Sequence, residues 1–61
     1  MTRKDYKIIA SAIEHEVAGW RSQNNSDELG AIKCLAYELC ERLLADNPNF
    51  NSEKFMTACG F

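Results

Sequence analysis

Two polar interruptions limit the chain to three helical segments. One is the run Gln23–Ser26, and the other surrounds Pro48, the only proline. Both are typical of turns, and between them apolar residues recur at helical rather than alternating spacing. The sequence therefore predicts an all-α fold in a single domain over residues 1–61. We expect two long antiparallel helices over about 3–22 and 27–46, and a short C-terminal helix over about 52–59.

The first predicted helix has a clear start and two apolar stripes. Thr2, followed by Asp5 three residues later, forms a capping-box pattern. At about 100° per residue, one stripe is expected in the core and contains Tyr6, Ile9, Ile13, Val17 and Trp20. A second stripe lies roughly 100–160° around the helix and contains Ile8, Ala12, His15 and Gly19. Because two of these residues are small, another helix can approach closely, so this helix is expected to touch two neighbours.

The second predicted helix has one central apolar face. Asn25 or Ser26 can cap it. Its expected core residues are Leu29, Ile32, Leu39 and Leu43, with Ala36 and Cys40 between them. Tyr37 and Leu44 widen one edge of this face, and Leu35 lies beyond the other edge. Leu35 is therefore a candidate for an interface outside the core.

The third predicted helix is short but strongly marked. Asn51 can cap it, and Phe50 and Phe55 stand at the two positions of a hydrophobic staple. Gly60 falls where a helix end favours a left-handed residue, which lets the following Phe61 pack on Met56. A two-turn helix is unstable alone. We therefore expect it to dock on the helix pair, with its share of the core coming from Phe50, Phe55 and Met56.

The size and the net charge of the chain limit its possible functions. Ordering a chain costs about 1.5 kcal/mol per residue, and 61 residues offer few large apolar side chains to offset this cost. Self-association or a partner would relieve the shortage. A net charge of −2 creates no field to attract nucleic acid or an anionic membrane. With no apolar run of transmembrane length and no signal-peptide pattern, we expect a cytoplasmic protein that does not enter a membrane.

No pattern in the chain points to catalysis. His15 is the only histidine, and Cys34, Cys40 and Cys59 show no metal-ligand spacing. Phosphate-binding glycine loops and nucleophile elbows are absent from the sequence. We expect a protein that is not an enzyme and has no metal or cofactor, with three free thiols, of which Cys34 is on the polar side of its helix.

Both ends of the chain resemble one family. The opening is Met1-Thr2-Arg3-Lys4-Asp5-Tyr6, and the ending contains Asp46-Asn47-Pro48-Asn49-Phe50 and Ala58-Cys59-Gly60-Phe61. Together, over about half the chain, they resemble a family of very small, functionally uncharacterised proteins of bacteriophages and integrated mobile elements. Relatives carry more charge in the tail, where this chain has Asn49, Asn51 and Ser52. The resemblance implies a viral or mobile-element origin and a bacterial cytoplasm, and it supplies no catalytic residues.

Two functions fit these observations. The leading hypothesis is an accessory protein that binds a bacterial protein stoichiometrically, in host takeover or in inhibition of an antiviral defence system. The alternative is a small dimeric nucleic-acid-binding regulator, because Arg3, Lys4 and Lys7 cluster and the last two helices could imitate a helix-turn-helix. Its recognition helix would present one cation and one anion, where phosphate binding needs several cations.

The candidate interface follows from the second stripe. It contains Ile8, Ala12, His15, Gly19 and Leu35. Either a second copy of the chain pairs through this stripe as a twofold homodimer, or the third helix covers it within one chain.

Overall fold

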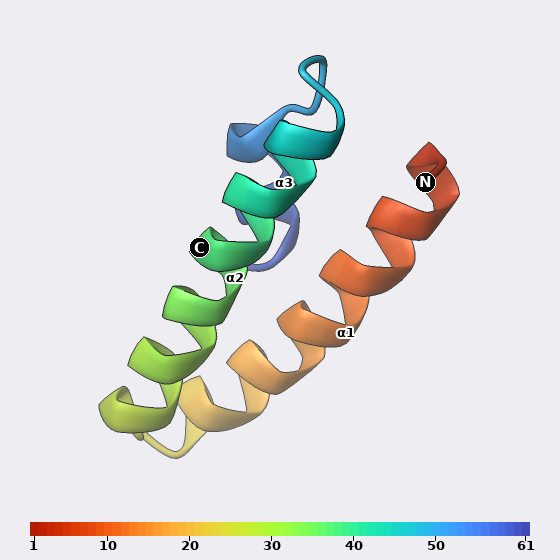
Figure 1. The fold of residues 1–61 in the computed structure, drawn as a ribbon. Coiled ribbons are helices and arrows are strands. Elements are labelled where there is room, and N and C mark those ends of the chain that lie inside the picture. The colour runs from red at the N-terminus through yellow and green to blue at the C-terminus, as the bar shows by residue number, and fades with distance from the viewer.

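The computed structural model describes all 61 residues and confirms the all-α fold. Helix α1 spans Arg3–Ser22, α2 spans Ser26–Asp46 and α3 spans Ser52–Ala58. The predicted bounds of α1 are confirmed, whereas α2 begins one residue earlier than expected and α3 ends one residue earlier. Figure 1 shows α1 and α2 as an antiparallel hairpin that opens like a V away from its turn. None of the three helices combines the length and apolar character needed to cross a membrane.

Each helix begins at the cap that its sequence predicts. At α1, the Asp5 backbone N–H donates to the Thr2 hydroxyl at 3.3 Å, and the Thr2 N–H donates to the Asp5 carboxylate at 2.9 Å. Asn25 caps α2 and Asn51 caps α3 through their side-chain oxygens. These oxygens satisfy backbone donors that have no partner inside the helix.

The end of α3 forms the left-handed termination that its sequence indicates. Gly60 has a φ of +97°. The Gly60 N–H donates to the Thr57 carbonyl at 3.0 Å, and the Phe61 N–H donates to the Met56 carbonyl at 3.1 Å. This pair of hydrogen bonds is the Schellman motif, and it turns Phe61 back toward α2.

Helix α3 runs parallel to α1 and antiparallel to α2. At its start, the rings of Phe50 and Tyr6 lie 5.0 Å apart. At its end, the Arg21 guanidinium donates to the Gly60 carbonyl at 3.2 Å, and the Lys33 ammonium lies 5.9 Å from the centre of the Phe61 ring. Helix α3 and its tail therefore contact both arms of the hairpin along their length and hold the two arms together.

The core is small, and none of the predicted core residues is exposed. The fully buried residues are Ala10, Val17, Ala36, Cys40, Phe55 and Cys59. Of the twelve predicted core residues, Val17 and Phe55 are buried and the other ten are partly buried. Phe50 and Phe55, the predicted staple, have ring centres 5.5 Å apart. The apolar cluster lies where α3 meets the facing sides of α1 and α2.

Candidate interaction surfaces

The second stripe of α1 faces solvent. Ile8, Ala12, His15 and Gly19 are all exposed, and Ile8 retains 58% of its accessible surface. A methyl group added at Gly19 would meet no atom within 4 Å. The alternative in which the third helix covers this stripe within one chain is therefore wrong. Helix α3 and the residues that flank it pack instead on the other side of α1, against Tyr6, Ala10 and Val17.

Leu35 is also exposed, with 56% of its surface accessible. It lies on α2, so it does not extend the α1 stripe along the same helix. By helical periodicity it stands about 100° around α2 from the buried Ala36. The four α1 residues thus form one continuous candidate surface, and Leu35 is a separate exposed position.

The cysteines are free and differ in their environments. Cys34 is exposed, whereas Cys40 and Cys59 are buried in the apolar cluster. Burial raises the pKa of the Cys40 thiol, although the thiol also approaches the Ser52 carbonyl at 4.0 Å. Burial, with a smaller effect from Cys40, raises the pKa of Cys59 to about 11. Both buried thiols stay protonated at neutral pH, so they act as core side chains rather than nucleophiles.

His15 has no neighbours that would make a metal site with it. The structure contains no group of three or more His, Cys, Asp or Glu side chains that could hold a metal ion.

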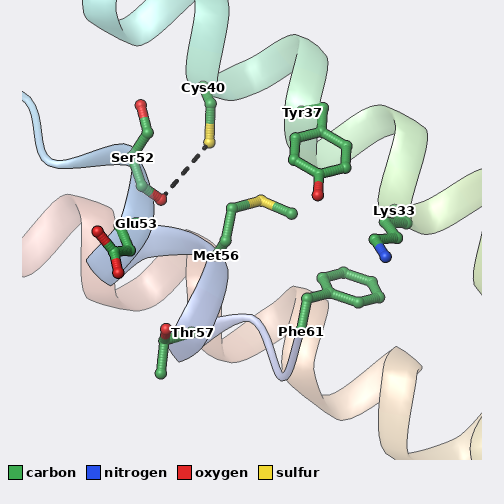
Figure 2. Close-up of a pocket in the computed structure, with 8 residues that line it drawn as sticks. All are labelled: Lys33, Tyr37, Cys40, Ser52, Glu53, Met56, Thr57 and Phe61. Carbon is green, nitrogen blue, oxygen red and sulfur yellow. Dashed lines mark hydrogen bonds between the residues drawn. The ribbon is translucent and has the colours of Figure 1, made fainter.

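A groove between α2 and α3 is the surface that sequence reasoning missed. Its volume is about 390 Å³. One wall comes from Lys33, Tyr37 and Cys40 of α2, and the other comes from α3 and its C-terminal tail, between Ser52 and Phe61 (Figure 2). Met56 and Tyr37 lie in its middle, and Tyr37 is 53% exposed. The one available signal was that Tyr37 and Leu44 widen the apolar face of α2 beyond what the core needs.

Opposite charges mark the two ends of this groove. Lys33 stands beside Phe61 at one end, and Glu53 stands beside Ser52 at the other (Figure 2). The only ion pair within the chain joins Arg42 to Glu38 at 3.9 Å on the exposed side of α2. Lys33 and Glu53 therefore have no oppositely charged partner inside the chain.

The fold and these surfaces define a small three-helix protein with two exposed faces and no reactive cluster. Comparison of the chain with known protein families, with curated proteins and with solved structures found no match.

Proposed function

We propose that this chain is an accessory protein of a bacteriophage or mobile element that binds a bacterial protein stoichiometrically in the cytoplasm. The observation that carries the proposal is the exposed stripe of α1, where Ile8 is followed along the same face of the helix by the small residues Ala12 and Gly19. A helix face that carries one apolar side chain and then small residues lets a partner helix or groove approach the backbone closely. Host takeover and inhibition of an antiviral defence system are two settings that fit such a protein.

The proposed mechanism is occupancy of a surface on the target. It requires no reactive group, because a tightly bound small domain can block a partner's own contacts. A binding face differs from a core face in one respect that can be tested. A charge at Ala12 should abolish partner binding and leave the fold intact, since Ala12 is exposed within the chain.

The experiment is affinity capture from a bacterial lysate with three proteins: the parent, Ala12→Glu and Ala18→Glu. Ala18 is exposed on the same helix but outside the stripe, so it is the matched control. We expect a host protein that the parent and Ala18→Glu retain and Ala12→Glu loses. The purified pair should then bind at one-to-one stoichiometry in calorimetry. Retention of that protein by all three baits would overturn the stripe as the binding face.

The same capture tests nucleic-acid binding, the alternative function. Retained DNA or RNA that is released as salt rises, without a specific protein, would favour a nucleic-acid-binding regulator. The exposed side of α3 offers Lys54 beside Glu53, which is weak support for phosphate contacts.

Self-association is the second part of the proposal. Of the six buried residues only Phe55 has a large side chain, which leaves little apolar burial to stabilise a monomer. A homodimer would add burial without a longer chain.

A further inference from the structure

The single chain is more open than a compact protein of its size. Its accessible surface is 4526 Å², whereas a compact monomer of this mass has about 4,000 Å². Its radius of gyration is 11.6 Å, against about 10.5 Å for a compact domain of 61 residues. The excess surface follows from the hairpin, whose two arms spread apart away from their turn (Figure 1), and a partner that covered part of it would stabilise the fold.

The α2–α3 groove contains Tyr37, the one aromatic residue of the chain whose side chain is exposed. Tyr37 is 53% exposed and Leu44 is 44% exposed. Leu44 follows Tyr37 by seven residues, so both lie on the same side of α2. Met56 and Phe61 line the groove from α3 and its tail. Tyr, Met and Phe are enriched in the buried centres of protein interfaces. The α1 stripe contains none of these residue types.

The charges at the ends of the groove indicate which partner fits it. Lys33 and Glu53 lie on opposite sides of Met56 (Figure 2), and neither has an ion-pair partner within the chain. A twofold axis through the middle of the groove would place Lys33 opposite Glu53 of the partner subunit. The same operation would place Glu53 opposite Lys33 of the partner subunit. A face with one charge of each sign at its two ends is therefore complementary to itself.

We infer that two copies of this chain form a twofold dimer through the α2–α3 groove, with Tyr37 and Met56 at its centre and reciprocal Lys33–Glu53 pairs at its ends. This inference rests on the self-association proposed above and places it on a different face from the α1 stripe. A standard interface removes about 800 Å² from each partner, less than a fifth of the surface that this chain exposes. The α1 stripe then stays free for a host protein.

Sedimentation equilibrium over a concentration series is the first measurement. The parent should show a species of twice 6.9 kDa that dissociates on dilution. A parent that stays at 6.9 kDa up to millimolar concentration overturns the dimer and the self-association proposal together, while the host-protein proposal stands or falls by capture.

Charge reversal then tests the face. Lys33→Glu or Glu53→Lys alone puts like charges opposite each other twice, so each should raise the dimer dissociation constant about tenfold or more. The double variant should restore dimerisation, and an equimolar mixture of the two single variants should form the heterodimer. Only a reciprocal Lys33–Glu53 arrangement predicts both recoveries. Lys7→Glu, an exposed change on α1, should leave the dissociation constant unchanged.

Tyr37→Ser tests the centre without relying on charge. Tyr37 is half exposed in the monomer, so the variant should keep the helical circular dichroism spectrum while losing the dimer. A dimer that survives both Tyr37→Ser and the single charge reversals overturns the groove as the interface and leaves self-association on another face.

Discussion

The two helices of the hairpin contain 20 and 21 residues and supply four of the six buried residues, whereas α3, with only 7 residues, supplies Phe55 and, through its cap, Cys59. The hairpin's four are Ala10, Val17, Ala36 and Cys40, all of modest size. The large buried ring comes from the short segment. The two long helices therefore set the shape of the hairpin, and the short helix α3 supplies the side chains that pack its two arms together.

The largest expected effect comes from removing the central ring of the short segment. Truncation of a buried Phe costs about 3–5 kcal/mol, so Phe55→Ala should largely unfold a domain this small. Deletion from Asn51 onward should do the same. Leu35→Ala, at an exposed position of the hairpin, is the control and should change stability by less than about 0.5 kcal/mol. Urea titration followed by circular dichroism measures each.

If Phe55→Ala unfolds cooperatively at nearly the same urea concentration as the parent, α3 does not hold the hairpin together. Helix α3 would then be an appendage of a self-sufficient hairpin, and its aromatic residues would become the leading candidates for a partner site.

The second effect concerns Cys59, the other buried side chain of the short segment. Its pKa rises from 9.0 to about 11 because burial disfavours the thiolate. The unfolded chain therefore loses this proton first as pH rises. The stability that the protonated thiol provides is complete below pH 9 and is lost between pH 9 and about 11, which amounts to roughly 2–3 kcal/mol.

Unfolding measured by urea at pH 8, 9, 10 and 11 tests this dependence. Cys59→Ala should flatten the loss of stability over that range, whereas Cys34→Ala, which changes an exposed thiol, should keep it. An equal alkaline loss in the parent and in Cys59→Ala would show that the thiol is accessible to solvent and that the tail of α3 is not firmly docked.

A pair of glycines gives the third effect, with opposite signs in the two regions. Gly60 has a φ of +97° and an added methyl group would lie 3.4 Å from Val17 Cγ1, so Gly60→Ala should cost about 1 kcal/mol. Gly30 lies within α2, and a methyl group there would meet nothing within 4 Å. Gly30→Ala should therefore stabilise the protein by about 0.5–1 kcal/mol. Thermal melts compare the two, and a neutral Gly60→Ala would mean that the Schellman turn is not needed for docking.

The smallest expected effect concerns the start of α1, at the N-terminal end of the hairpin. The backbone N–H of Thr2, followed by its hydroxyl, lowers the pKa of Asp5 from its usual 3.8. The stability that the ionised Asp5 carboxylate gives to the cap is therefore complete above the unfolded pKa of 3.8. It is lost as the pH falls through the lower pKa that Asp5 has in the folded protein. Amide hydrogen exchange of the first turn of α1, measured from pH 5 downward, should show fraying that Asp5→Asn displays already at neutral pH. If the parent and the variant exchange alike, the capping box does not stabilise this end.

Local signals predicted the helices well because each acts over a few residues. Thr2 with Asp5, and Asn51 with Phe50 and Phe55, give the starts of α1 and α3 without reference to the rest of the chain. The left-handed turn at Gly60 depends on its lack of a side chain and on its place after the helix. Helical periodicity also identified the core-facing stripes of α1 and α2, because a stripe is a property of one helix.

Periodicity placed one α1 stripe in the core, but it could not decide whether α3 covers the second stripe as well. Both are apolar enough to contact a neighbour, and the outcome depends on the path of the chain from Asn47 to Asn51, which brings α3 to the side of Tyr6 and Val17. The wide apolar face of α2 was the only sequence signal for the α2–α3 groove, and it did not show which segment lies opposite. Lys33 and Glu53 are twenty residues apart in the chain, and they mark opposite ends of one groove only because α3 folds back antiparallel to α2. A helix determines its own faces through its residue spacing, but which faces meet depends on contacts between segments distant in the chain, and only the packed structure contains these.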